Sequence, residues 1–190
     1  YFGFPPHTYA LSYPAPGSPE LAARVCNLLN AAKIDNGTDD TRGFDHGVFV
    51  PQLIIDPAAE IPVVMMSLRE DLDPAAHIAI GKALAPLRDE GVLIVGSGSS
   101  YHNLRDFFGS DGRPSVPFDD WLAEPANAPD AAQRNARLVG WEKAPNARRC
   151  HPREEHLLPL MVAAGASGEP GQHDFGEVVL GGAVSGFRFA

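Results

Sequence analysis

A run of four apolar residues, Val92 to Val95, followed by a turn rich in Gly and Ser, limits the fold of this chain more than any other stretch. A short β-branched run that is apolar on both faces is typical of a central parallel strand covered by helices. The turn from Gly96 to Ser100 would end the strand with residues that tolerate unusual backbone angles and leave main-chain N–H groups free. Ligands of open α/β sheets bind beyond the carboxyl ends of the strands, which predicts that His102 lies near a site. Alone, however, a histidine after a strand is more often a hydrogen-bonded loop residue.

A second buried strand is predicted at residues 61–68, where Pro62 is tolerated near the first position. Asp73 and Pro74 then start a helix that ends at Gly91. Such a strand, helix and strand over residues 61–96 form the right-handed crossover that builds parallel sheets. The tail from Phe175 to Phe189 alternates in the manner of a strand pair. We therefore predict an α/β fold with a central, mainly parallel sheet flanked by helices and a C-terminal strand pair.

Further helices are indicated by start signals and apolar spacing. Ser18, Pro19 and Glu20 combine a hydroxyl cap, a proline at the first helical position and an acid at the positive end of the dipole. Residues 19 to about 33 then show helical periodicity. Segment 48–55 favours a helix because Pro51 forbids a central strand. The other expected helices are 118–123, 129–141 and 153–164.

The bulk composition excludes several classes of partner. A chain of 190 residues suits one domain, so residues 1–190 are expected to form a single catalytic domain. The net charge of −9 argues against nucleic acid and against an anionic membrane surface. Cys26 and Cys150 show neither a disulfide framework nor a thiolate metal motif. No apolar run approaches the ~20 residues that span a bilayer, and no signal peptide is evident, so a cytoplasmic location is expected.

Three of the seven histidines stand in contexts that suggest a site. His46 lies between Asp45, whose carboxylate can raise its basicity, and a glycine that lets the backbone approach a ligand. His102 follows the predicted strand, and His156 lies near the start of a predicted helix. His151 is not expected to join it, because five residues correspond to roughly 140° around a helix. Without an HxxxH or HxH pair, the spacing alone indicates no more than a histidine-rich acid–base or metal site.

Several motifs follow one another in a particular order along the chain. They are GFPP at 3–6, YPAPGSPELA at 13–22, RGFDHG at 42–47, IPVV at 61–64 with Ser67-Leu68, LAPLRDEGVLIVGSGS at 84–99, HNL at 102–104 and EHLLPL at 155–160. Together they resemble the class III extradiol ring-cleavage dioxygenases, specifically the DOPA 4,5-dioxygenase type. The resemblance covers nearly the whole chain. It implies an α/β fold with a central sheet and an oxygen-dependent opening of a catechol ring beside its two hydroxyls.

The resemblance also implies roles for the three histidines. His156 matches a metal ligand, His102 matches an acid–base residue or a further ligand, and His46 matches a histidine that faces substrate or oxygen. The implied metal is Fe(II) or Zn(II), and residue type does not choose between them because imidazole binds both. A histidine that titrates near neutral pH can take a proton from the catechol and return it later. The implied partners are a small catecholic substrate and O₂.

This chain departs from the family in one respect. Family members carry two further metal-ligating histidines in a segment before the point where this chain begins. We expect a chain that lacks its N-terminal segment and associates with it or forms a homo-oligomer. The alternatives are a metal-free degenerate binding or scaffold domain of the same fold, and a zinc-dependent hydrolase that uses the same histidines with an activated water.

Overall fold

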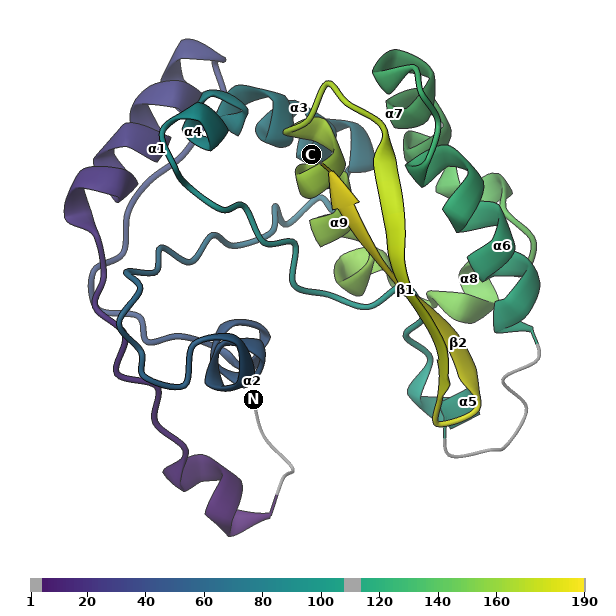
Figure 1. Cartoon of the computed structure of the whole chain (residues 1–190), viewed down its shortest axis with the longest axis horizontal. Helices are drawn as coiled ribbons and strands as arrows, with labels where there is room; N and C mark the ends of the chain where they lie inside the picture. The colour runs from purple at the N-terminus through teal and green to yellow at the C-terminus, as the bar shows by residue number, and fades with distance from the viewer. Residues whose placement is uncertain (1–4, 108–113, 190) are drawn as a thin grey trace. The chain divides into compact units, whose positions relative to one another are not determined.

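The computed structural model describes residues 5–107 and 114–189, and the chain divides into two compact units, with the boundary in the sequence between Ser67 and Leu68. Figure 1 shows the helices and strands of both units along the chain. Each unit is described by itself. The expectation that residues 1–190 form a single catalytic domain stays a prediction.

The first unit contains a short 3-10 helix, η1 (Pro6–Ala10), and two α-helices, α1 (Pro19–Ala31) and α2 (His46–Ile55). The predicted start of α1 is confirmed, because the Ser18 hydroxyl accepts a hydrogen bond from the Leu21 N–H at 3.2 Å. The helix predicted at 48–55 is confirmed as α2, with Pro51 inside it. The Tyr13 hydroxyl donates to the Asp56 carbonyl at 2.9 Å and so ties the Pro-rich connector to the end of α2.

The second unit is built from helices around a C-terminal hairpin. Its longer helices are α3 (Pro74–Leu84), α6 (Ser115–Ala126), α7 (Ala131–Val139) and α9 (Leu158–Gly165). Its shorter ones are α4 (Pro86–Asp89), α5 (Leu104–Phe107), η2 (Trp141–Lys143), α8 (Ala147–Cys150) and η3 (Glu154–His156). Helix α9 packs against α3, and α6 packs against α7 and the second strand of the hairpin. Figure 1 shows the hairpin crossing between α9 and α6.

The predicted C-terminal strand pair is confirmed. Strands β1 (Gly171–Val179) and β2 (Gly182–Phe189) pair antiparallel, with Val179 opposite Gly182 and Gly171 opposite Phe189. Leu180 and Gly181 form a two-residue turn in which both φ angles are positive, 50° and 85°. That combination matches the twist of the flanking strands. Strand β2 packs against the core through Val184, Phe187 and Phe189.

The mixed helix and sheet class is confirmed, but the two predicted central strands are corrected. Within residues 5–107 and 114–189 the sheet is the pair β1–β2, whereas segments 61–68 and 92–95 have no strand partner. Ile61 is 60% exposed and Leu93 82% exposed. The apolar character of these runs indicated buried strands. A strand also needs a neighbouring strand to pair with, and the composition of one segment does not show whether such a neighbour exists. Of the strand, helix and strand unit predicted over residues 61–96, the structure therefore contains the helical part, α3 and α4, but neither strand.

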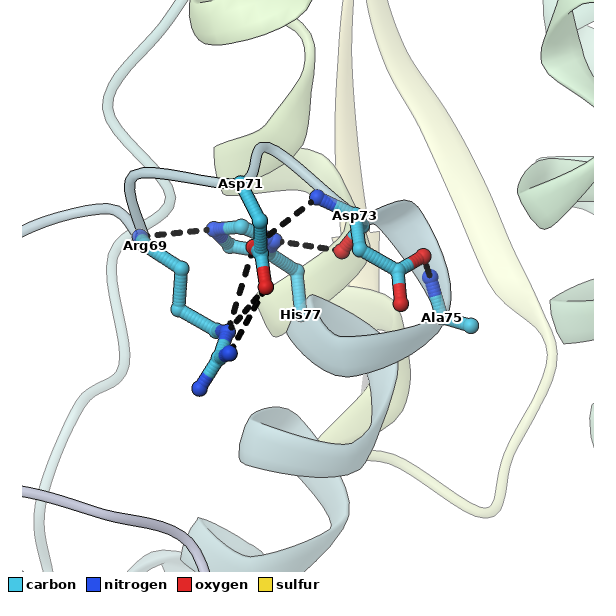
Figure 2. Close-up of polar contacts among 5 residues, drawn as sticks. All are labelled: Arg69, Asp71, Asp73, Ala75 and His77. Carbon is cyan, nitrogen blue, oxygen red and sulfur yellow. Dashed lines mark hydrogen bonds and ion pairs between the residues drawn. The ribbon is translucent and has the colours of Figure 1, made fainter.

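A buried histidine fixes the entry to α3. His77 is 1% exposed; its Nδ1 lies 2.7 Å from the Asp73 carbonyl, and its Nε2 accepts from the Arg69 N–H at 3.3 Å. The Asp73 carboxylate caps the helix by accepting from the Ala75 N–H at 2.9 Å. Figure 2 shows these contacts together with the Arg69–Asp71 ion pair outside them.

The core of the second unit joins α6, α7, α8 and α9. Its buried members are Ile78, Tyr101, Phe118, Leu122, Leu138, Trp141, Ala144, Ala147, Cys150, Leu157, Leu158, Met161 and Ala164. Arg134 is also fully buried, and its guanidinium donates to the carbonyls of Ala164, Ser167 and Glu169 at and beyond the end of α9. These bonds place the positive charge of the guanidinium at the carbonyl end of α9, where the helix dipole favours a cation.

Helices α3 and α9 approach closely through glycines, which gives a first testable prediction. A Cβ at Gly81 would collide with the backbone of Val162, Gly165 and Ala166. We therefore expect Gly81→Ala to lower the free energy of unfolding by about 1–3 kcal/mol, although alanine normally favours a helix. Denaturant titration measures the change.

Gly168→Ala is the matched control, because no atom lies within 4 Å of the added methyl. A Gly81→Ala variant as stable as Gly168→Ala would contradict this account of the α3–α9 contact.

Candidate metal and acid–base site

Two segments of the second unit run side by side and carry the predicted site residues. One is residues 99–103, called the site strap, and the other is residues 149–156. The Ser99 N–H donates to the His156 carbonyl at 2.8 Å, and the His102 N–H donates to the Cys150 carbonyl at 3.1 Å. The Asn103 side-chain amide donates to the Arg149 carbonyl at 2.8 Å. The strap is thus held along its length by the segment that bears His156.

These hydrogen bonds bring His102 and His156 together. Their imidazole rings stack with centroids 3.5 Å apart and planes inclined by 13°. Both side chains are half-buried, and the Nδ1 of His156 lies 3.8 Å from a Glu155 carboxylate oxygen. Two residues far apart in sequence therefore form one histidine pair at the point that the strap reaches after the Gly-rich turn.

The stacked geometry distinguishes what the two rings can do. An imidazole nitrogen offers its lone pair in the plane of the ring. Rings that are nearly parallel and 3.5 Å apart direct their lone pairs side by side, so both cannot aim well at one ion. The arrangement suits one metal ligand and one neighbouring acid–base group better than two ligands of the same metal.

His156 lies on the wall of a cavity of about 590 Å³. This volume is within the range of small-molecule sites. The other walls are the segment 92–96, the turn 98–100, one side of α9 and residues 185–189 of β2. Arg88 lies at the same cavity and donates to the carbonyls of Ala166 and Phe189 at 3.3 and 3.2 Å.

The glycines of the Gly-rich turn allow its backbone to lie close to η3 and α9. A Cβ on Gly98 would collide with the His156 carbonyl, and one on Gly96 would lie 2.5 Å from the Pro159 carbonyl. Neither glycine has a positive φ. The sequence predicted that glycines matter in this turn because they tolerate unusual backbone angles. In the structure they are needed because a side chain would not fit beside η3 and α9.

A second prediction follows from this contact. We expect Gly98→Ala to push the turn away from His156, to break the Ser99–His156 hydrogen bond and to cost about 1–3 kcal/mol of unfolding free energy. Thermal or denaturant unfolding checks the change. The exposed Ser97→Ala is the control, because it adds no atom to the contact. Equal stability of the two variants would show that the close approach does not matter.

His46 belongs to the first unit, whereas the histidine pair belongs to the second. It is exposed and begins α2 of the first unit, and the Asp45 carboxylate beside it forms an ion pair with Arg42 at 3.8 Å. Within the part of the chain that the structure describes, no three His, Cys, Asp or Glu side chains gather closely enough to hold a metal.

Two other titratable side chains near the strap, Tyr101 and Cys150, keep their protons at neutral pH. Burial, followed by the Asp106 carboxylate, raises the pKa of Tyr101 to about 12. Burial also raises the pKa of the Cys150 thiol to about 12. Asp106 pairs with Arg149 at 3.1 Å and accepts from the Tyr101 hydroxyl at 3.3 Å, so it fixes α5 to the strap.

Sequence reasoning missed His151, which is completely buried beneath the strap. Its Nε2 donates to the Ser100 carbonyl at 2.9 Å. The estimate that a helix would turn His151 away from His156 does not apply, because α8 ends at Cys150 and η3 begins only at Glu154. Pro152, directly after His151, was the available signal for this break.

Comparisons with known proteins point to one family. Residues 4–184 match the family described as the catalytic LigB subunit of aromatic ring-opening dioxygenase. A 4,5-DOPA dioxygenase extradiol of Beta vulgaris is 42% identical over 177 residues, which are 88% of this chain and 63% of that protein. The protein of the same description in Escherichia coli K12 is 36% identical over 169 residues, 86% of this chain and 61% of that protein.

A solved structure shares the fold. The crystal structure of an uncharacterised protein of Escherichia coli K12 superposes with a TM-score of 0.81 and 32% sequence identity, covering 93% of this chain and 76% of that one. The chain spans 63%, 56% and 62% of the length of three of the curated relatives it matches. Among the described residues, none of the helices has the length and apolar character needed to cross a bilayer.

Proposed function

Because this chain belongs to the family of the catalytic LigB subunit of aromatic ring-opening dioxygenases, we propose that it is an extradiol dioxygenase that opens the ring of a small catechol with O₂. The observation that carries the proposal is the stacked pair of His102 and His156 beside a cavity of small-molecule size. The names of the relatives support a catecholic substrate, and they make L-DOPA the first compound to test.

His156 would hold the metal, Fe(II) or Zn(II), together with ligands from outside the pair. When bound, a divalent metal supplies a Lewis acid that favours the deprotonated catechol and holds it near O₂. Imidazole suits either metal. Glu155, 3.8 Å from the Nδ1 of His156, places a negative charge near that ring and so favours a donor that binds cations.

His102 would accept a proton. Its ring lies against that of His156, so a catechol hydroxyl close to His156 would also be close to His102. A nitrogen of His102 without a proton can take the hydroxyl proton as the catechol binds, and return it when the ring opens. The strap hydrogen bond from the His102 N–H to Cys150 keeps this side chain in place. His46, by the family resemblance, would face substrate or oxygen.

The proposal is tested with the full-length protein. The protein is mixed with Fe(II) without air, catechols including L-DOPA are added, air is admitted, and the yellow ring-opened product is followed by its absorbance. We expect product from at least one catechol of the panel. Stoichiometric bound iron with no product from any of them would overturn the proposal.

Two controls separate the alternatives. Elemental analysis of the purified full-length protein distinguishes a metal-dependent enzyme from a binding domain that has lost its metal. Esterase or amidase turnover by the zinc-loaded protein, with no consumption of O₂, would indicate a hydrolase instead.

A further inference from the structure

His151 occupies an unusual position for a polar side chain. It is 0% exposed and packs against two aromatic rings of the core, Phe118 at 5.3 Å and Trp141 at 5.9 Å between centroids. Burial lowers the pKa of His151 to about 4, so the ring is neutral at physiological pH. A neutral ring surrounded by apolar groups could be replaced by a phenylalanine if packing were its only task.

The hydrogen bond of His151 fixes its tautomer. The Ser100 carbonyl can only accept, so the proton must be on Nε2 and Nδ1 must be the unprotonated nitrogen. That Nδ1 is buried and has no hydrogen-bond partner among the described residues. A buried polar atom without a partner costs stability, which an apolar residue would avoid. The position therefore keeps a histidine in spite of a cost to folding.

The acceptor of this bond is part of the site. Ser100 is two residues before His102 on the strap, and Cys150, which receives the His102 N–H, directly precedes His151. On the other side of Ser100, the Ser99 N–H donates to the His156 carbonyl. The bond from His151 to Ser100 thus lies between the two contacts that bring the histidine rings together, and its donor is buried in the core against Phe118 and Trp141.

We propose that His151 is a positioning residue that holds His102 against His156 through the Ser100 carbonyl. Its effect on turnover rests on the proposed function, whereas its effect on the geometry of the pair does not. Loss of the bond would let the strap shift while leaving the core packed, and a displacement of about 1 Å at a reacting group can cost about 100-fold in rate.

Two variants of the full-length chain separate positioning from packing. His151→Phe keeps an aromatic ring against Phe118 and Trp141 but has no hydrogen-bond donor. His151→Gln keeps an amide N–H that can reach the Ser100 carbonyl but loses the aromatic ring. If His151 serves only packing, the Phe variant should resemble the wild type more closely in ring stacking and in kcat. If His151 positions the strap, the Gln variant should.

The first readout is the proton NMR spectrum of the metal-free protein. Stacking places the ring protons of His102 and His156 over each other's faces, so they are shielded in the wild type. We expect His151→Gln to keep the shielded signals and His151→Phe to lose them. If the Phe variant does not fold, His151→Leu takes its place.

The second readout is steady-state kinetics of the iron-loaded protein. We expect kcat of His151→Phe to fall about 100-fold with KM nearly unchanged, and kcat of His151→Gln to stay close to wild type. A Phe variant that keeps both the shielded signals and kcat, or a Gln variant that loses as much as Phe, would overturn the proposal. If the wild type opens no catechol, the proposed function fails, and the NMR comparison still decides the role of His151.

Discussion

Replacement of His102 by alanine is expected to lower kcat for ring opening by about 100- to 10,000-fold and to leave the fold intact. The magnitude is that of a lost general acid–base group. The fold should persist because His102 is half-buried and its contribution to the strap is its backbone N–H, which alanine retains. Absorbance assays of the full-length, iron-loaded protein give kcat, and circular dichroism with thermal unfolding checks the fold.

The control is His7→Ala, because His7 is an exposed histidine in η1 of the first unit. Metal content is measured for both variants, so that a lost ligand is distinguished from a lost acid–base group. If His102→Ala kept the metal and also kept full kcat, the catalytic assignment would be wrong. If it lost the metal together with activity, His102 would be a ligand and the interpretation of the stacked rings would need revision.

The stability of the protein is expected to fall by about 3 kcal/mol through His151 as the pH is lowered from about 6.5 to about 4. Burial lowers the pKa of His151 from 6.5 to about 4. The unfolded chain therefore takes up a proton at this residue below pH 6.5, whereas the folded protein does not until about pH 4. The contribution is fully present above the unfolded pKa and is lost as the pH falls toward the folded one.

Other groups titrate over the same interval, so the wild type is compared with His151→Gln. Denaturant unfolding at a series of pH values gives the two stability curves, and their difference should follow the titration of one buried histidine. Parallel curves over this range would mean that His151 takes up its proton equally in both states, and the assignment of a buried neutral ring would fail.

Local signals in the sequence predicted local structure well. Ser18 and Asp73 are the caps of α1 and α3, as their positions before a proline suggested, and Gly91 ends the following turn with a φ of 78°. The alternation of the tail predicted the hairpin. These features depend on contacts between near neighbours in the chain, which short-range physical chemistry specifies.

Pairing between distant segments could not be predicted in the same way. The run Val92–Val95 has the composition of a central strand, yet no partner pairs with it among the described residues. The composition of this segment shows only that its side chains prefer a buried strand. Whether the segment is buried and paired depends on the residues that pack around it.

The candidate site was inferred from the order of motifs and not from the spacing of the histidines. His102 and His156 are far apart in sequence, and nothing in their separate contexts places their rings 3.5 Å apart. His151 was missed because a helix was assumed where the chain breaks around Pro152. The contact that determines its role, with the Ser100 carbonyl, is a long-range bond that no local pattern specifies.

The most direct test of the central claim is the ratio of O₂ consumed to ring-opened product formed. An oxygen electrode and an absorbance measurement on the same sample of full-length, iron-loaded protein with a productive catechol give both quantities. The proposed dioxygenase predicts one O₂ for each product molecule, and both rates should collapse together in His102→Ala. Turnover without oxygen uptake, or oxygen uptake that His102→Ala leaves unchanged, would contradict the account.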